Sequence, residues 1–118
     1  MLQLICWLAL AAVHAMPALA FFRPATITTM YSLQSDNPLF LLMHHRAAFF
    51  VAVFAFCLWA AFDTYPRRAA VVLVAISMLS FLWLYFSNGA PKPLKTIATV
   101  DLVGLPFLAY VAWKAFAP

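Results

Sequence analysis

Hydrophobic residues fill four long stretches of the chain, and short polar segments separate them. A helix needs about twenty mainly apolar residues to cross the hydrocarbon core of a bilayer, and all four stretches are close to that length. Loop residues such as Arg23-Pro24 and Ser87-Asn88-Gly89 mark their ends. The pattern therefore predicts membrane spans over residues 2–22, 38–62, 69–87 and 94–116.

The first apolar stretch and the connection that follows it carry signals besides hydropathy. The first apolar stretch ends in small residues at 18–20 that resemble a signal-peptidase site, but no Lys or Arg precedes its apolar run. We therefore interpret it as a transmembrane helix. The connection over residues 23–37 is the only long one, and Ile27, Met30, Tyr31 and Gln34 recur in it at helical spacing. This spacing predicts a short helix at the membrane surface.

Composition supports a membrane protein. Of the 118 residues, 68% are hydrophobic and 8% are charged, whereas a soluble domain is about half apolar and a quarter charged. Backbone groups inside a bilayer must form their hydrogen bonds within the protein, which favours helices. We predict an all-α, integral membrane protein in which residues 1–118 form one antiparallel four-helix bundle.

The net charge of +4 does not indicate a nucleic-acid partner, because the basic residues are scattered singly or in pairs between apolar stretches. Their distribution also predicts no membrane orientation, since each side of the bundle receives three of them. One side has Arg23, Lys92 and Lys95, and the other has Arg67, Arg68 and Lys114.

Several polar side chains inside the spans are expected to be structural. Cys6 and Cys57 lie in apolar runs without the spacing of a metal site, so we predict buried thiols and no metal ligand. Ser77 and Ser80 are expected to form hydrogen bonds only with carbonyls of their own helix.

Apart from Lys95 and Lys114 near the ends of the last span, five residues with basic or acidic side chains lie inside the predicted spans, where each charge costs about 2.5 to 3.5 kcal/mol. They are His14, His44, His45, Arg46 and Asp101. At a rise of about 1.5 Å per residue, His14 and Arg46 lie roughly 12 Å along their helices from one membrane side, and Asp101 lies roughly 10 Å from it. Successive residues of a helix point about 100° apart, so the three adjacent residues 44–46 cannot all face the bundle interior.

The shared depth predicts an ion pair between Arg46 and Asp101, because each charge would otherwise be unpaired in hydrocarbon. His14 would complete a polar cluster, and Pro17 and Pro106 would each free a backbone carbonyl near it. Two interpretations stay open. The charges hold two helices in register, or the cluster binds a ligand.

The sequence shows no nucleophile beside a base, so we expect no catalytic activity. The leading hypothesis is an accessory subunit that binds a partner protein or a lipid-like ligand through the polar cluster, within a larger membrane complex or a homo-oligomer. One alternative is a redox protein, in which the phenylalanines after Arg46 stack on a quinone or His14 ligates haem with His44 or His45. Another is a small transporter in which Asp101 carries a proton or cation.

Several motifs resemble those of a known family. In chain order they are Met30-Tyr31, Asp36-Asn37-Pro38, Leu42-Met43-His44-His45-Arg46-Ala47, Ser77-Met78-Leu79-Ser80-Phe81 and Val100-Asp101. Over nearly the whole chain this order is similar to a family of small bacterial four-helix membrane proteins, which automated pipelines often label phosphopantetheine adenylyltransferase.

The resemblance implies that Arg46 and Asp101, together with His45, matter jointly, and that the membrane is a bacterial cytoplasmic membrane. It does not imply the labelled reaction. That enzyme is a soluble α/β protein with a histidine-bearing phosphate loop after a strand, whereas His44 and His45 lie in an apolar stretch.

Overall fold

The computed structural model describes all 118 residues, and every regular element in it is a helix. The four long helices are α1 (Leu2–Phe22), α3 (Leu39–Phe62), α4 (Arg67–Ser87) and α5 (Lys95–Phe116). A short helix, α2 (Ala25–Tyr31), follows α1, and one turn of 3-10 helix, η1 (Lys92–Leu94), precedes α5. Each long segment is long and apolar enough to cross a membrane, so the chain is a multi-pass membrane protein by length and hydropathy. The predicted all-α bundle is confirmed.

Loop residues end the helices close to the predicted positions. At the start of α3, the Asn37 side-chain oxygen accepts a hydrogen bond of 2.9 Å from the backbone N–H of Leu39. At the end of α4, the Asn88 side-chain amide donates to the Leu84 carbonyl at 2.7 Å. Gly89 follows with a φ of +81°, a conformation that glycine adopts without steric cost.

The long connection contains the predicted short helix. Ile27 of α2 is fully buried against Ala20 and Ala47, which joins α2 to the ends of α1 and α3. The helix ends at Ser32, which has a left-handed φ of 56°. Gln34 therefore lies in the following loop, and our expectation that it continues the helical face was wrong.

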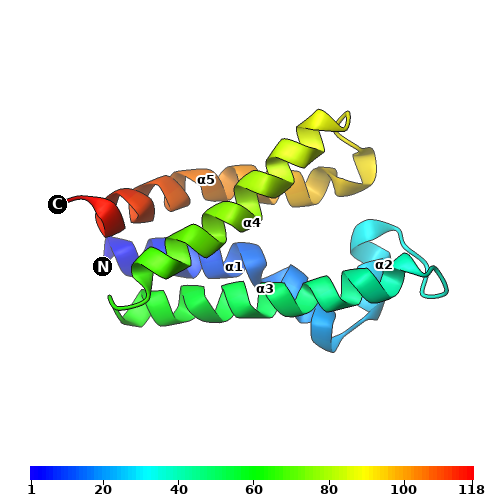
Figure 1. Ribbon diagram of the computed structural model, residues 1–118, viewed down its shortest axis with the longest axis horizontal. Coiled ribbons are helices and arrows are strands. Elements are labelled where there is room, and N and C mark those ends of the chain that lie inside the picture. The colour runs from blue at the N-terminus through cyan, green and yellow to red at the C-terminus, as the bar shows by residue number, and fades with distance from the viewer.

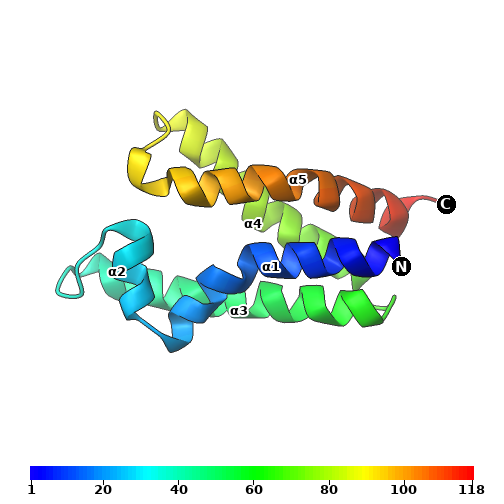
Figure 2. The ribbon, with the colours of Figure 1, turned by 180° about the vertical axis from the view of Figure 1, so that it is seen from behind.

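The four long helices are antiparallel in sequence order, and both termini lie at one end of the molecule (Figure 1). α1 packs along α3, while α5 packs against both α1 and α4. α4 crosses the bundle at an angle, so it lies close to α3 near the turn that joins them and diverges from it toward the other end (Figures 1 and 2). We call the end with the termini the closed end and the end with α2 and η1 the open end.

The buried core follows this divergence. A cluster of fourteen buried residues, including Trp7, Leu10 and Val74, joins all four long helices on the closed side. Both cysteines belong to it, which confirms that they are buried thiols. Toward the open end the core divides into two separate clusters of three residues. One lies between α1, α2 and α3, and the other, formed by Leu82, Tyr85 and Ala98, lies between α4 and α5.

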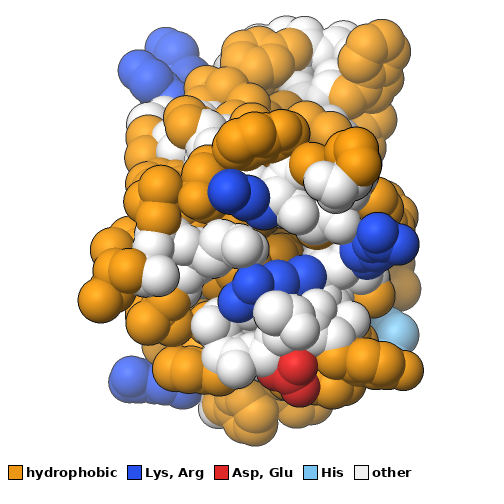
Figure 3. Space-filling model, turned by 90° about the vertical axis from the view of Figure 1, so that its left-hand side faces the viewer, with side chains coloured by type: hydrophobic (Ala, Val, Ile, Leu, Met, Phe, Trp, Pro, Cys, Tyr) orange, Lys and Arg blue, Asp and Glu red, His pale blue; other side chains and the backbone are white.

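Basic side chains form hydrogen bonds with carbonyls in the last turns of two helices. Figure 3 looks onto the closed end, where Lys and Arg side chains lie among hydrophobic ones. Arg67 Nε donates to the Ala60 carbonyl at 2.8 Å and its Nη1 donates to Gln3 at 3.1 Å, while Arg68 Nε donates to the Ala115 carbonyl at 3.0 Å. The last carbonyls of a helix lack partners within it, so these arginines satisfy the ends of α3 and α5.

Candidate functional site

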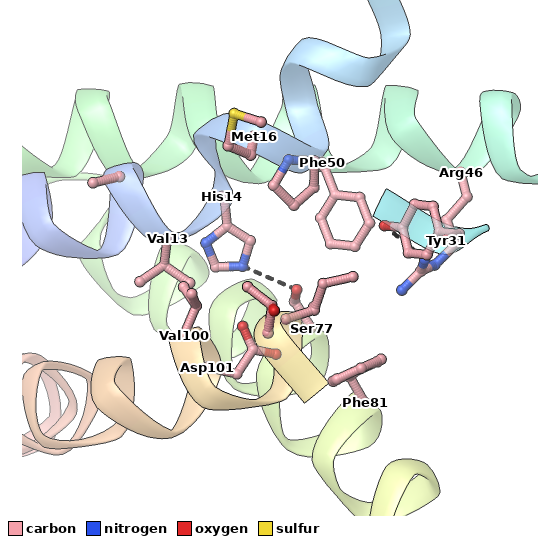
Figure 4. A pocket seen from close by; sticks show the side chains of 14 residues that line it. Val13, His14, Met16, Tyr31, Arg46, Phe50, Ser77, Phe81, Val100 and Asp101 are labelled. Carbon is pink, nitrogen blue, oxygen red and sulfur yellow. Dashed lines mark hydrogen bonds between the residues drawn. The ribbon is translucent and has the colours of Figure 1, made fainter. Parts of the chain in front are cut away.

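Three of the five ionisable residues predicted inside the spans line one cavity of about 210 Å³. His14 comes from α1, Arg46 from α3 and Asp101 from α5, and Figure 4 shows all three side chains around the same space. The three side chains thus lie close together, as counting residues along antiparallel helices predicts from their common depth. The remaining walls include Phe50 of α3 and Ser77 of α4.

His14 is held by two hydrogen bonds and is only 2% exposed. Its Nδ1 lies 2.9 Å from the Leu10 carbonyl, and its Nε2 lies 3.0 Å from the Ser77 hydroxyl. A carbonyl can only accept, so Nδ1 carries a proton, and in the neutral ring Nε2 accepts from the serine. Ser77 therefore links α4 to α1, and our expectation that it bonds only within its own helix was wrong. Ser80 does bond within its helix, to the Ile76 carbonyl.

Arg46 does not form the predicted ion pair with Asp101. Its guanidinium lies over the Phe50 ring, 4.7 Å from the centroid, and 5.9 Å from the centroid of Tyr31. Nη1 also makes a long contact of 3.5 Å with the Tyr31 hydroxyl. Aromatic faces stabilise a guanidinium that has lost part of its water, and this explains how Arg46 lies in an apolar bundle without a carboxylate beside it. Figure 4 shows Arg46 and Asp101 on different sides of the cavity.

Asp101 is the least satisfied polar group of the site. It is only 9% exposed and borders the cavity, yet no side chain donates a hydrogen bond to it and no basic group pairs with it. A charge removed from water without a partner is costly, and this cost is large inside a membrane. Asp101 is thus an acceptor that faces the cavity without a partner from the protein.

His44 and His45 lie outside this arrangement. His44 Nε2 donates to the Phe21 carbonyl at 2.9 Å, and the His44 ring packs against Phe21. His45 is exposed on the surface of α3. Neither lines the cavity, so the structure does not bring these two histidines to the group of His14, Arg46 and Asp101. Both His14 nitrogens have hydrogen-bond partners, so ligation of haem by His14 would require one of these bonds to break.

The two helix-interior prolines behave differently. Pro17 is buried in α1 and lines the cavity next to His14, and α1 changes direction along its length in Figure 2. Pro106 is exposed on α5 and does not line the cavity. Leu102, whose carbonyl Pro106 is expected to free, does not line the cavity either.

Two apolar spaces extend from the polar cavity. The open-end groove, about 600 Å³, is lined mainly by hydrophobic residues such as Leu42, Met43 and Leu84. The α3–α4 crevice, about 180 Å³, opens where these two helices diverge. Arg46 and Phe81 line all three spaces, so they form the junction between the polar cavity and both apolar paths.

Sequence reasoning missed two contributors. Tyr31 was assigned only to a surface helix, but it reaches the cavity and contacts Arg46. Thr96 also lines the cavity, and nothing in the local pattern around it indicates this. Both lie near the open end, where the loop geometry decides which side chains meet.

Comparison of the chain with family models, characterised proteins and solved structures finds no match. No known protein therefore indicates what the candidate site binds.

Proposed function

We propose that this membrane protein binds a lipid-like amphiphile, with the polar group of the ligand in the cavity and its apolar tail passing through the α3–α4 crevice into the bilayer. The observation that supports this most directly is the position of Arg46, which borders both the polar cavity and the crevice. A binding site for an amphiphile needs this continuity, because polar and apolar parts of one molecule must be satisfied together. A quinone and a phospholipid both fit this general class.

We propose binding without catalysis as the main role, in an accessory subunit. The family resemblance implies a bacterial cytoplasmic membrane as its location. Nearly all of the 118 residues lie in or beside the four spans. An accessory role predicts copurification with a larger membrane complex in mild detergent. Recovery only as a free homo-oligomer would contradict that role and leave ligand binding to be judged by itself.

Photo-crosslinking tests ligand binding. Purified protein in mixed micelles is incubated with a phospholipid that carries a photoreactive group in its tail, and crosslinked peptides are mapped by mass spectrometry. We expect crosslinks on the parts of α3 and α4 that line the crevice, and competition by the same lipid without the photoreactive group. Labelling spread evenly over all lipid-facing helices would refute a specific site.

Matched variants sharpen this test. Leu84→Trp adds bulk to a residue that lines both the groove and the crevice, and it should reduce specific crosslinking. Leu79→Trp is the control, because Leu79 lies on the same helix and is similarly exposed, at 51% against 58%, but lines neither space. Arg46→Gln should reduce binding, whereas Arg23→Gln, at an exposed position of the same membrane side, should not.

One contact favours a second candidate function. The Ser77 hydroxyl lies 3.0 Å from His14 Nε2, and the Leu10 carbonyl fixes the opposite nitrogen, which is the arrangement of an activated nucleophile. In ester cleavage, Ser77 would attack the carbonyl carbon, His14 would pass the serine proton to the departing alcohol, and water would then release the acid. Labelling of Ser77 by a fluorophosphonate, lost in Ser77→Ala and kept in Ser80→Ala, would favour this chemistry. No labelling would favour binding alone.

A further inference from the structure

We propose that the ligand of this cavity is a phospholipid with a zwitterionic, primary-ammonium headgroup, of the phosphatidylethanolamine class. This inference rests on the lipid-binding function proposed above and specifies the chemistry of the head. The cavity has separate groups of donors and acceptors, and no salt bridge joins Arg46 to Asp101 across it.

The donors come from α2 and α3. The Arg46 guanidinium has five N–H groups and lies against aromatic faces, with no carboxylate in a salt bridge to it. The Tyr31 hydroxyl accepts a long contact of 3.5 Å from Nη1, and its own O–H can donate to a ligand in the cavity that Tyr31 also lines. A guanidinium with an adjacent hydroxyl suits a phosphate, which accepts charge-assisted hydrogen bonds through several oxygens.

The acceptors come from α4 and α5. Asp101 is more than nine-tenths buried, borders the cavity and has no partner in the protein. Ser77 donates its proton to His14, so its oxygen lone pairs remain free to accept. Thr96 supplies a further hydroxyl oxygen on the cavity wall. A primary ammonium has three N–H donors and one positive charge, and these three acceptors match it in number and in sign.

The cavity size favours a small head. At about 210 Å³ it is smaller than the range of roughly 300–1,000 Å³ for sites that enclose a whole drug-sized ligand. The polar head therefore enters, and the acyl chains leave through the α3–α4 crevice into the bilayer, since the open-end groove leads toward the membrane surface. A trimethylammonium head is bulkier and has no N–H to donate to Asp101, and a glycerol head lacks the positive charge.

The experiment measures headgroup selectivity by competition. The photoreactive phospholipid is displaced by unlabelled lipids with identical acyl chains and ethanolamine, choline or glycerol heads. We expect the ethanolamine lipid to compete about tenfold more strongly than the other two, the effect expected of one charge-assisted hydrogen bond. Asp101→Asn, which keeps the side-chain shape, should remove the preference over the glycerol lipid while retaining binding. Asp36→Asn, an exposed acid of the α2–α3 loop, is the control and should keep the preference.

The outcomes separate this inference from the proposed function. Specific labelling without headgroup preference, or a preference that persists in Asp101→Asn, would overturn the ethanolamine assignment and leave lipid binding intact. Stronger competition by a quinone with no effect of any phospholipid would overturn it as well. Equal competition by water-soluble glycerophosphoethanolamine would show that the site takes a free head and not a lipid. Absence of any specific labelling would remove both proposals.

Discussion

The hydrogen bond between His14 and Ser77 gives a quantitative prediction, because it joins α1 to α4 deep in the spans, whereas the Arg67–Gln3 bond joins them at the closed end. Hydrogen bonds between transmembrane helices are worth about 0.6 kcal/mol on average and up to about 1.7 kcal/mol. Nε2 borders the cavity, where water can replace the lost hydroxyl, so Ser77→Ala should lower the free energy of unfolding by an amount near the lower value. A double-mutant cycle with His14→Ala isolates this term from the space that the smaller side chain leaves.

The assay is reversible unfolding in mixed micelles, with the coupling energy calculated from four proteins: the unsubstituted chain, Ser77→Ala, His14→Ala and the double variant. Ser80→Ala is the matched control, because Ser80 lies one turn along the same helix and bonds only to the Ile76 carbonyl. Its coupling to His14→Ala should be zero within error. Equal coupling for both serines, or none for Ser77, would refute the bond as a link between the two helices.

Three further predictions follow from other parts of the molecule. A Cβ on Gly104 would lie 2.7 Å from the flexible end of Met78, so Gly104→Ala should destabilise the fold slightly and Gly104→Leu severely, measured in the same unfolding assay. Outside the spans, the Tyr65 backbone N–H and then the Trp59 indole N–H hold the pKa of the Asp63 carboxyl below its ordinary value. The stabilisation is therefore complete above about pH 4 and is lost as the pH falls through the lower, folded-state pKa, so Asp63→Asn should reduce the fall in Tm on acidification. Finally, gently solubilised protein should show no Soret band before or after dithionite reduction, and a band that shifts on reduction would restore the haem alternative.

Periodicity and helix-end signals were sufficient to predict the long helices. The predicted span 38–62 differs by one residue from α3, and 2–22 coincides with α1. Boundaries at loops were less accurate, since α4 begins at Arg67, two residues before the predicted start. Charged residues can occupy a first helical turn at the membrane surface, and hydropathy alone does not distinguish that turn from a loop.

The site was only partly predictable, for physical reasons. Residue counting gives depth, so it brought His14, Arg46 and Asp101 together. It does not give direction around the helix axis, and for that reason His44 and His45 were grouped with them although they face elsewhere. The ion-pair prediction failed because it considered only opposite charge, whereas the guanidinium is stabilised by aromatic rings that a sequence cannot place beside it.

The divided core has a mechanical consequence. Buried contacts tie the four helices together at the closed end, while at the open end α1, α2 and α3 form one packed group and α4 and α5 form another. Spreading the two groups apart would break few buried contacts, because each group has its own apolar cluster. The two helix groups can therefore move apart at the open end while the closed end stays packed. A ligand that contacts Arg46 in one group and Asp101 in the other would fix the distance between the groups.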